Sequence, residues 1–132
     1  MAKLTEEMKE MIATQLCFIG TVNADGTPNI APKRSTRVLS EESLIFTEGT
    51  GGATYSNIKR GSKVSVAVVN SDIIDGYRFF GDASLLESGD LYDAAASAAV
   101  KSGRKVPVAV TVINIKEIHS LKPGSGAGKK VA

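Results

Sequence analysis

The sequence predicts a mainly β domain with short helices, folded as a small antiparallel barrel of six strands. Apolar residues alternate with smaller or polar ones in short runs, as in residues 64–69, and this alternation is typical of half-buried strands. Turn signals such as Asp25-Gly26 separate the runs, and short strands at such spacing indicate a closed or partly closed barrel. No repeat or linker divides residues 1–121, so we expect one domain there. Residues 122–132 are rich in Lys, Gly and Ser, which predicts a flexible C-terminal tail.

Helical spacing and capping residues predict three helices. Near the N-terminus, Met8, Met11 and Ile12 recur at helical spacing after Thr5, which is a capping candidate. A short second helix would end at Gly61, where glycine suits a C-terminal cap. The third helix is rich in alanine, and its thin face allows a close approach to a neighbour. We expect these helices at residues 5–15, 53–60 and 88–101.

Alternation and turn pairs predict the strands. The first strand precedes Asp25-Gly26, which is a strong hairpin signal, and the fifth contains Gly81, the mark of a bulge or a tight barrel corner. The last strand is long and strongly β-branched. We expect the strands at residues 16–22, 29–38, 44–47, 64–69, 76–86 and 107–119.

The composition limits the classes of function. The net charge of +2 is too small to indicate a nucleic-acid partner. With four Phe, three Tyr and no Trp, the chain also has few aromatic residues on which bases could stack. A single cysteine, Cys17, permits no internal disulfide, as in a reducing cytoplasm. The sequence has neither a basic signal region nor an apolar run of roughly 18 residues. We therefore expect a cytoplasmic protein with no membrane partner.

A glycine-rich corner at residues 47–54 lies between the third strand and the second helix. Helix starts leave backbone N–H groups unpaired and carry partial positive charge, so such a corner can hold an anion. Glycines permit close approach of the backbone, and the hydroxyls of Thr50 and Thr54 add donors. The pattern is compatible with an ordinary loop, but we favour a phosphate-anchoring corner for a nucleotide.

Four segments, in this order, resemble the FMN-binding split-barrel family that includes pyridoxamine 5′-phosphate oxidase. They lie at residues 25–33, 44–47, 51–58 and 76–81, and the resemblance covers residues 16–121. It implies a six-stranded split barrel of Greek-key type and an FMN cofactor at the interface of a homodimer. It also implies an oxidoreductase or electron-transfer role towards a small-molecule substrate or redox partner.

The resemblance places the FMN site on two segments and implies no catalytic side chain and no metal. Ten residues would contact the cofactor: Pro32, Lys33, Arg34, Ser35, Thr47, Glu48, Gly49, Thr50, Gly51 and Thr54. The first four would follow the flavin or its phosphate, the next three would line the ring through their backbones, and the last three would face the phosphate. Family members often have a basic residue directly before this threonine, where the chain has Ala53. The phosphate charge would then be balanced by Lys33, Arg34, Arg37 or Lys59.

Other interpretations remain open. The same barrel could bind the deazaflavin F420 or haem without flavin redox activity. The chain has no Arg-rich C-terminal segment like the one that pyridoxamine phosphate oxidase uses to hold its substrate, so that activity is not assigned. Cys17 lies in an apolar strand and is expected to be buried. His119, beside Lys116 and Glu117, is expected to be exposed.

Overall fold

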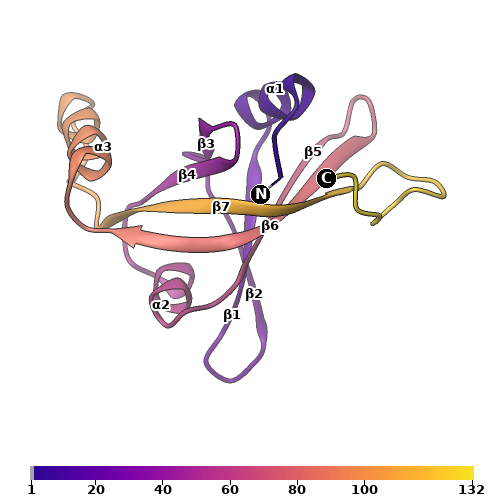
Figure 1. The fold of residues 1–132 in the computed structure, drawn as a ribbon. Helices are drawn as coiled ribbons and strands as arrows, with labels where there is room; N and C mark the ends of the chain where they lie inside the picture. The colour runs from indigo at the N-terminus through magenta and orange to yellow at the C-terminus, as the bar shows by residue number, and fades with distance from the viewer. Residues whose placement is uncertain (1) are drawn as a thin grey trace.

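A single curved antiparallel sheet with three helices makes up the computed structural model, which describes residues 2–132 (Figure 1). Its seven strands are hydrogen-bonded in the order β2-β1-β5-β6-β7-β4-β3. The elements in chain order are α1 (Glu6–Thr14), β1 (Cys17–Val22), β2 (Pro28–Pro32), β3 (Arg37–Ser40), β4 (Ser43–Glu48), α2 (Ala53–Lys59), β5 (Val64–Asn70), β6 (Asp75–Leu86), α3 (Asp90–Lys101) and β7 (Ala109–Ser120).

The mainly β antiparallel architecture is confirmed, but the prediction of six strands was wrong. The strand expected at residues 29–38 is two strands, because the chain turns between β2 and β3. The Thr36 backbone N–H donates to the Lys33 carbonyl at 3.1 Å, and the Thr36 hydroxyl donates to the same oxygen at 2.8 Å. The turn ends the pairing with β1 at Pro32, which itself lacks a backbone N–H.

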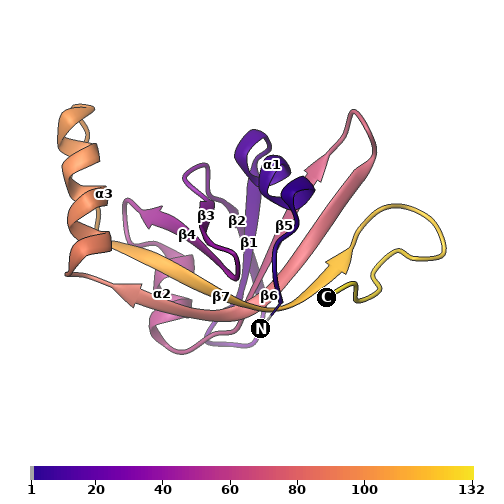
Figure 2. The same cartoon turned by 45° about the horizontal axis from the view of Figure 1, so that its top comes forward.

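The sheet is not closed. β2 and β3 follow each other in sequence but form the two opposite edges of the sheet, and no ladder joins them. The connection from Pro32 to Arg37 can span at most about 18 Å, so the sheet must curl until its two edges approach each other. Figures 1 and 2 show the result, in which β1 and β2 cross the long strands β6 and β7 at a steep angle. We call the segment that joins the two edges, residues 33–36, the crossing. An open seam between the two edges runs beside this segment.

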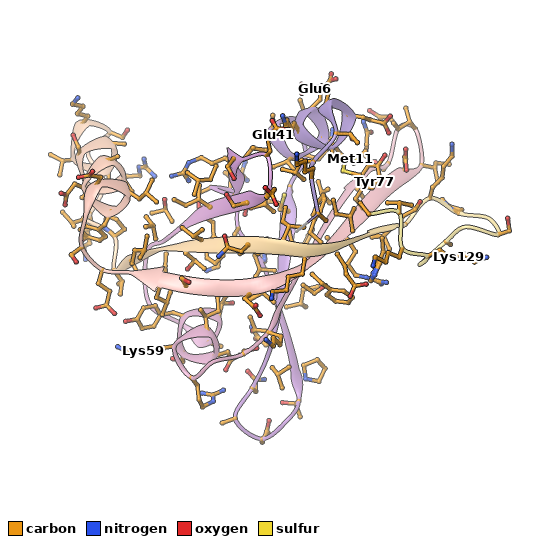
Figure 3. All side chains as sticks on the ribbon, in the orientation of Figure 1. Glu6, Met11, Glu41, Lys59, Tyr77 and Lys129 are labelled. Carbon is orange, nitrogen blue, oxygen red and sulfur yellow. The ribbon has the colours of Figure 1, made fainter. Side chains whose placement is uncertain are left out.

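The core fills the inside of the curled sheet and is covered by α1. Met8 and Met11 of α1 pack into the same buried cluster as Phe46 and Phe79. The N-terminus of α1 is capped as predicted, since the Thr5 hydroxyl accepts from the Met8 backbone N–H at 3.2 Å. Figure 3 shows Tyr77 and Glu41 beside this helix; the Tyr77 hydroxyl donates to Glu7 at 2.7 Å, and Glu41 pairs with Lys9.

A buried polar network holds α2 against the hairpin of β1 and β2. The Asn57 amide donates to the Thr21 hydroxyl at 3.0 Å and to the Asn23 side-chain oxygen at 2.8 Å. The Arg60 guanidinium donates to Asn57 Oδ1 at 2.7 Å, so the amide of Asn57 is fully engaged. The network fixes α2, the helix that follows the glycine-rich corner, against the hairpin.

The third helix, α3, stands apart from the rest of the molecule at one end of the sheet in both views (Figures 1 and 2). Only Ala95 and Ala99 of this helix are buried. The Tyr92 hydroxyl anchors α3 by donating to the Pro107 carbonyl at 2.7 Å. The helix therefore leaves space between itself and the crossing.

Two expectations about single residues have different outcomes. Cys17 is buried, as predicted, and this burial raises the pKa of its thiol from 9.0 to about 11. His119 is not exposed; only 8% of its surface is accessible, because it lies opposite Arg78 in the β6–β7 ladder. Its Nδ1 accepts from the Arg78 guanidinium at 2.9 Å, and Phe80 meets its ring edge-on at 4.8 Å. The prediction for His119 was wrong because cross-strand partners cannot be read from local sequence.

Beyond β7 the chain turns back on the end of that strand. The Ser120 N–H donates to the Lys129 carbonyl at 2.9 Å, and the Val131 N–H donates to the Ile118 carbonyl at 2.7 Å. Of the helices within residues 2–132, none is long and apolar enough to cross a membrane. The same residues contain no group of three His, Cys, Asp or Glu side chains placed to hold a metal ion.

Candidate functional site

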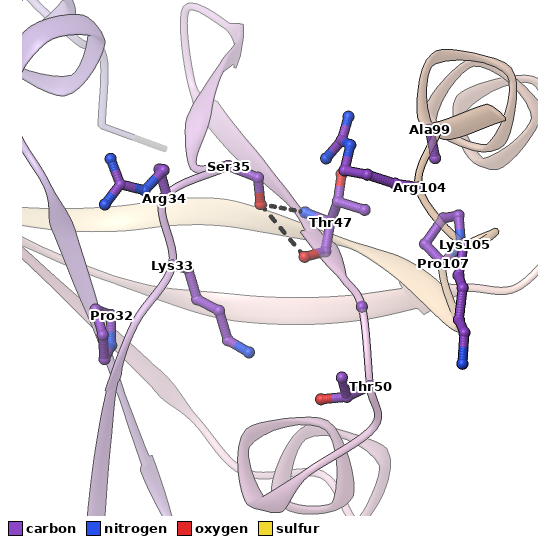
Figure 4. A pocket seen from close by; sticks show the side chains of 11 residues that line it. Pro32, Lys33, Arg34, Ser35, Thr47, Thr50, Ala99, Arg104, Lys105 and Pro107 are labelled. Carbon is purple, nitrogen blue, oxygen red and sulfur yellow. Dashed lines mark hydrogen bonds between the residues drawn. The ribbon is translucent and has the colours of Figure 1, made fainter. Parts of the chain in front are cut away.

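A cavity of about 490 Å³ opens where the crossing, the end of β4 and the loop after α3 meet (Figure 4). It exists because the sheet edges do not pair and because α3 stands away from them. Its lining residues are Pro32, Lys33, Arg34, Ser35, Thr47, Gly49, Thr50, Ala99, Arg104, Lys105 and Pro107. None of these 11 residues is acidic.

The structure brings most of the predicted site residues together here. Seven of the ten line the cavity: Pro32, Lys33, Arg34, Ser35, Thr47, Gly49 and Thr50. Glu48 is buried and contacts the lining through Lys33. Gly51 and Thr54 are not part of the lining; Thr54 is buried, and its hydroxyl accepts from the Asn29 amide at 3.3 Å. The glycine-rich corner therefore borders the cavity through Gly49 and Thr50 and not through Thr54.

Lys33 and Glu48 form an ion pair at the cavity. The Lys33 Nζ atom lies 3.0 Å and 3.2 Å from the two carboxylate oxygens, and it sits 5.7 Å from the centroid of the Phe46 ring. The Glu48 side chain is only 2% exposed, whereas that of Lys33 is 19% exposed. The Gly51 backbone N–H also donates to Glu48, at 3.4 Å. Glu48 therefore neutralises Lys33 and ties the crossing to the glycine-rich corner.

Ser35 fastens the crossing to β4. Its hydroxyl accepts from the Thr47 backbone N–H at 2.8 Å and donates to the Thr47 carbonyl at 3.3 Å (Figure 4). A single side chain thus satisfies both backbone groups of a residue that faces the open seam. This contact holds one wall of the cavity in place without a β-ladder.

Sequence reasoning missed the cations on the far side of the cavity. Arg104 and Lys105 lie in the loop between α3 and β7, and Figure 4 shows both at the wall opposite Lys33. Within residues 2–132, the side chains of Arg104, Lys105 and Arg34 have no hydrogen-bond or salt-bridge partner. A basic pair directly after a helix and before Pro107 was the available signal, but only the fold places it opposite Arg34.

Two other predicted cations, Arg37 and Lys59, have hydrogen-bond partners and do not line this cavity. The Arg37 guanidinium donates to the Ser35 carbonyl at 2.8 Å, and desolvation lowers its pKa, although arginine stays charged at neutral pH. Lys59 lies on the outer side of α2 (Figure 3), where it contacts Tyr55 and Glu87. The hydrogen bond to Tyr55 raises the pKa of Lys59. Lys59 is therefore not at the cavity.

The cavity continues towards α3. A second recess of about 480 Å³ shares Arg34, Ser35, Thr47, Ala99 and Arg104 with the first. Its other lining residues are Thr36, Arg37, Ala94, Ala95 and Ala98. The alanine face of α3 thus forms a flat apolar wall beside a cluster of three guanidinium groups. Together the two recesses suit a ligand with an anionic end and a flat, apolar body.

Comparison with known proteins identifies the family. The family model described as pyridoxamine 5′-phosphate oxidase matches residues 4–122. An uncharacterized protein of Methanocaldococcus jannaschii is 34% identical over 134 residues, covering 98% of this chain and 89% of that protein. The crystal structure of HupZ from Group A Streptococcus is 40% identical and has a TM-score of 0.84, covering 95% of this chain and 99% of that chain.

Further structures show the same fold. A putative pyridoxamine 5′-phosphate oxidase from Lactobacillus delbrueckii is 35% identical with a TM-score of 0.75, covering 88% of this chain and 93% of that chain. An FMN-binding protein from Syntrophomonas wolfei is 20% identical with a TM-score of 0.72, covering 88% of this chain and 84% of that chain. An F420 reductase is 18% identical with a TM-score of 0.67, covering 87% of this chain and 98% of that chain. The matched span, the relatives and the fold agree, and the chain belongs to the pyridoxamine 5′-phosphate oxidase family.

Proposed function

We propose that the protein is an FMN-binding flavoprotein that acts as an oxidoreductase or electron-transfer protein towards a small molecule. The observation that carries this proposal is the charge of the cavity. Arg34, Arg104 and Lys105 surround it without partners, and the acid next to it, Glu48, is already neutralised by Lys33. Such a cavity attracts an anion, and the phosphate of FMN carries nearly two negative charges.

Hydrogen bonds from these cations can offset much of the free energy that desolvation of the phosphate costs. Each charge-assisted hydrogen bond contributes about 1.5–3 kcal/mol, so two or three of them offset much of the cost of desolvating the phosphate. Arg34 and Arg104 can each present two parallel N–H donors to one phosphate from a rigid planar guanidinium, a bidentate geometry that a lysine ammonium does not offer. The Thr50 hydroxyl at the edge of the cavity adds a further donor. In this proposal Lys33 does not hold the phosphate but lines the cavity as a neutralised pair with Glu48.

The rest of the cavity suits a flat ring. Pro32, Pro107 and the alanine face of α3 offer apolar contacts, and Ser35 and Thr47 are fixed by their mutual hydrogen bonds. When bound, the flavin ring supplies the redox chemistry, while these residues position it and limit the access of water. The related fold of an FMN-binding protein adds support.

We further propose that the working unit is a homodimer with the flavin at its interface, as the family resemblance implies. The cavity is open on one side in a single chain, so a second copy could complete its wall. The buried thiol of Cys17 is compatible with a reducing cytoplasm, where we place this activity.

F420 is the second candidate ligand. It shares an anionic tail with FMN, and the unpaired cations would attract either tail; an F420 reductase has a related fold. Haem is less suitable, because the single histidine, His119, is not at the cavity and its Nδ1 accepts from Arg78. The mass of the co-purified ligand distinguishes the three.

A fluorescence titration of the purified protein with FMN tests the proposal. Arg34→Ala and Arg104→Ala should each raise the dissociation constant by about tenfold to a hundredfold, because each removes charge-assisted bonds to the phosphate. Lys101→Ala is the control, since Lys101 is an exposed cation on α3 that does not line the cavity. Unchanged affinity in both arginine variants would remove the phosphate from this cavity.

A further inference from the structure

The last residues of the chain run back along the end of β7 (Figures 1 and 2). We name residues 128–132 the strap. The Ser120 N–H donates to the Lys129 carbonyl at 2.9 Å. The Val131 N–H donates to the Ile118 carbonyl at 2.7 Å. The strap therefore adds a short antiparallel segment to the edge of β7.

Backbone hydrogen bonds hold the strap, and none of the side chains of residues 128–132 is buried. Its one large apolar side chain, Val131, keeps 55% of its surface accessible. A segment with few buried apolar contacts opens locally at a small fraction of the free energy of global unfolding. A modest change in the part of β7 beneath the strap is therefore enough to release it.

His119 lies beneath the strap, as the cross-strand partner of Lys130. The Arg78 guanidinium donates to the Nδ1 atom of His119 from Nε at 3.2 Å and from a terminal nitrogen at 2.9 Å. A guanidinium can only donate, so Nδ1 carries a lone pair and the ring is neutral, with its proton on Nε2. The Nε2 atom lies 3.4 Å from a carboxylate oxygen of Glu117.

We propose that Arg78 and His119 form a pH-sensitive latch, which holds the strap on β7 at neutral pH and releases it in acid. Protonation of Nδ1 removes the acceptor for both hydrogen bonds, and two cations then face each other. Lys130 adds a third cation on the same face, because cross-strand partners share a face. Glu117 opposes this repulsion, but its side chain is 46% exposed and its contact is longer, so water screens it.

The direction of the pH dependence follows from the number of bound protons. With the strap closed, His119 accepts from Arg78 and binds no further proton, whereas the released form binds one more. Acid therefore favours release. Histidine ordinarily changes charge between pH 5 and pH 8, so the transition falls in this interval. One proton changes the ratio of released to closed strap by at most about tenfold per pH unit, and we expect a rise of at least about tenfold from pH 8 to pH 5.

Fluorescence anisotropy of the full chain with Val131→Trp tests this inference. The sequence has no Trp, so the introduced indole is the only one in the protein. Its anisotropy should fall as the pH is lowered from 8 to 5, because a released strap moves more freely. Ile73→Trp is the matched control, since Ile73 is 59% exposed at the turn between β5 and β6 and not in the strap. Its anisotropy should stay constant over the same interval.

Two further substitutions in the Val131→Trp background assign the pH dependence to the latch. His119→Asn keeps an acceptor near the position of Nδ1 but does not titrate, so the strap should stay closed at pH 5. Arg78→Gln removes the cation that the protonated ring would meet, so the pH dependence should shrink. The second variant keeps the test decisive if His119→Asn does not fold, which circular dichroism would reveal.

Each outcome decides for or against the latch. A fall in anisotropy with Val131→Trp alone, which is absent with His119→Asn and smaller with Arg78→Gln, supports the inference. A constant anisotropy with Val131→Trp alone, or an equal fall in the latch variants, would overturn it. A similar fall in the Ile73→Trp control would also overturn it, because acid would then loosen the whole fold. None of these outcomes depends on FMN, so failure of the latch and failure of the proposed function are distinguishable.

Discussion

Glu48 is a buried charge at the junction of the crossing, β4 and the glycine-rich corner. Its carboxylate receives Lys33 from the crossing and the Gly51 N–H from the corner. The pair is asymmetric, because the lysine reaches solvent and the glutamate does not. Charge that is buried without a partner is far more costly than charge that can reach water. Removal of Lys33 and removal of Glu48 should therefore lower the free energy of unfolding by different amounts.

The first prediction compares Lys33→Met with Glu48→Gln in urea unfolding. Lys33→Met leaves a buried carboxylate without its cation and should lower the free energy of unfolding by about 3 kcal/mol. Glu48→Gln keeps an oxygen acceptor of the same shape and leaves a lysine that can be hydrated, so it should cost about 1 kcal/mol. A larger loss for Glu48→Gln than for Lys33→Met would refute this account of the pair.

Cys17 gives a prediction for alkaline pH. Burial raises the pKa of its thiol from 9.0 to about 11, so the unfolded chain releases this proton before the folded chain does. The stabilisation by the neutral buried thiol is complete below pH 9 and is lost as the pH rises to about 11. The difference in unfolding free energy between wild type and Cys17→Ala should therefore shrink by about 2 kcal/mol across this interval. A constant difference would show that the pKa of the thiol is the same in the folded and unfolded chain.

At the scale of elements, the strands and helices were predictable where local patterning and global packing agree. The alternation in β5 and the Asp25-Gly26 turn identify their elements to within a residue or two. The break between β2 and β3 was not predictable, because residues 33–36 keep an extended-looking composition. Their turn depends on hydrogen bonds within the segment and on side-chain contacts with β4.

The β6–β7 pairing depends on a glycine at its irregular point. The register shifts between Phe80 and Gly81, and a Cβ atom on Gly81 would lie 2.3 Å from the Asn114 carbonyl oxygen. The backbones approach too closely there for any side chain. The bulge predicted from this interior glycine is confirmed as a register shift.

Gly81→Ala should therefore lower the free energy of unfolding by about 3 kcal/mol, since the strands must separate locally to admit the methyl group. Gly20→Ala is the matched control in another strand, where the nearest atom to a Cβ would be the Ser65 carbonyl oxygen at 3.5 Å. The control should change stability by less than about 0.5 kcal/mol. Equal effects of the two substitutions would mean that close approach at Gly81 does not matter.

At the scale of the whole molecule, the candidate site results from incomplete closure of the sheet. The crossing joins two unpaired edges, and α3, inserted between β6 and β7, brings Arg104 and Lys105 to the opposite wall. The near half of the site was predictable from sequence, because residues 32–35 and 47–50 lie on segments that resemble the family. The far half was not predictable, because Arg34 and Arg104 lie far apart in the sequence and only the fold brings them to the same cavity.

The same view explains why a single chain has a positively charged opening. Arg34 lies on the crossing, and Arg104 and Lys105 lie on the opposite wall of the same cavity. In the proposed function these cations attract the cofactor's phosphate. The proposed function needs no catalytic acid or base, because the flavin ring provides the redox chemistry.

Native mass spectrometry of freshly purified protein tests the central claim most directly, since it reports the ligand and the number of subunits together. We predict an assembly of two chains that carries FMN and releases it, with its yellow colour, on denaturation. A single chain without flavin, which stays so after FMN is added in excess, would contradict the account.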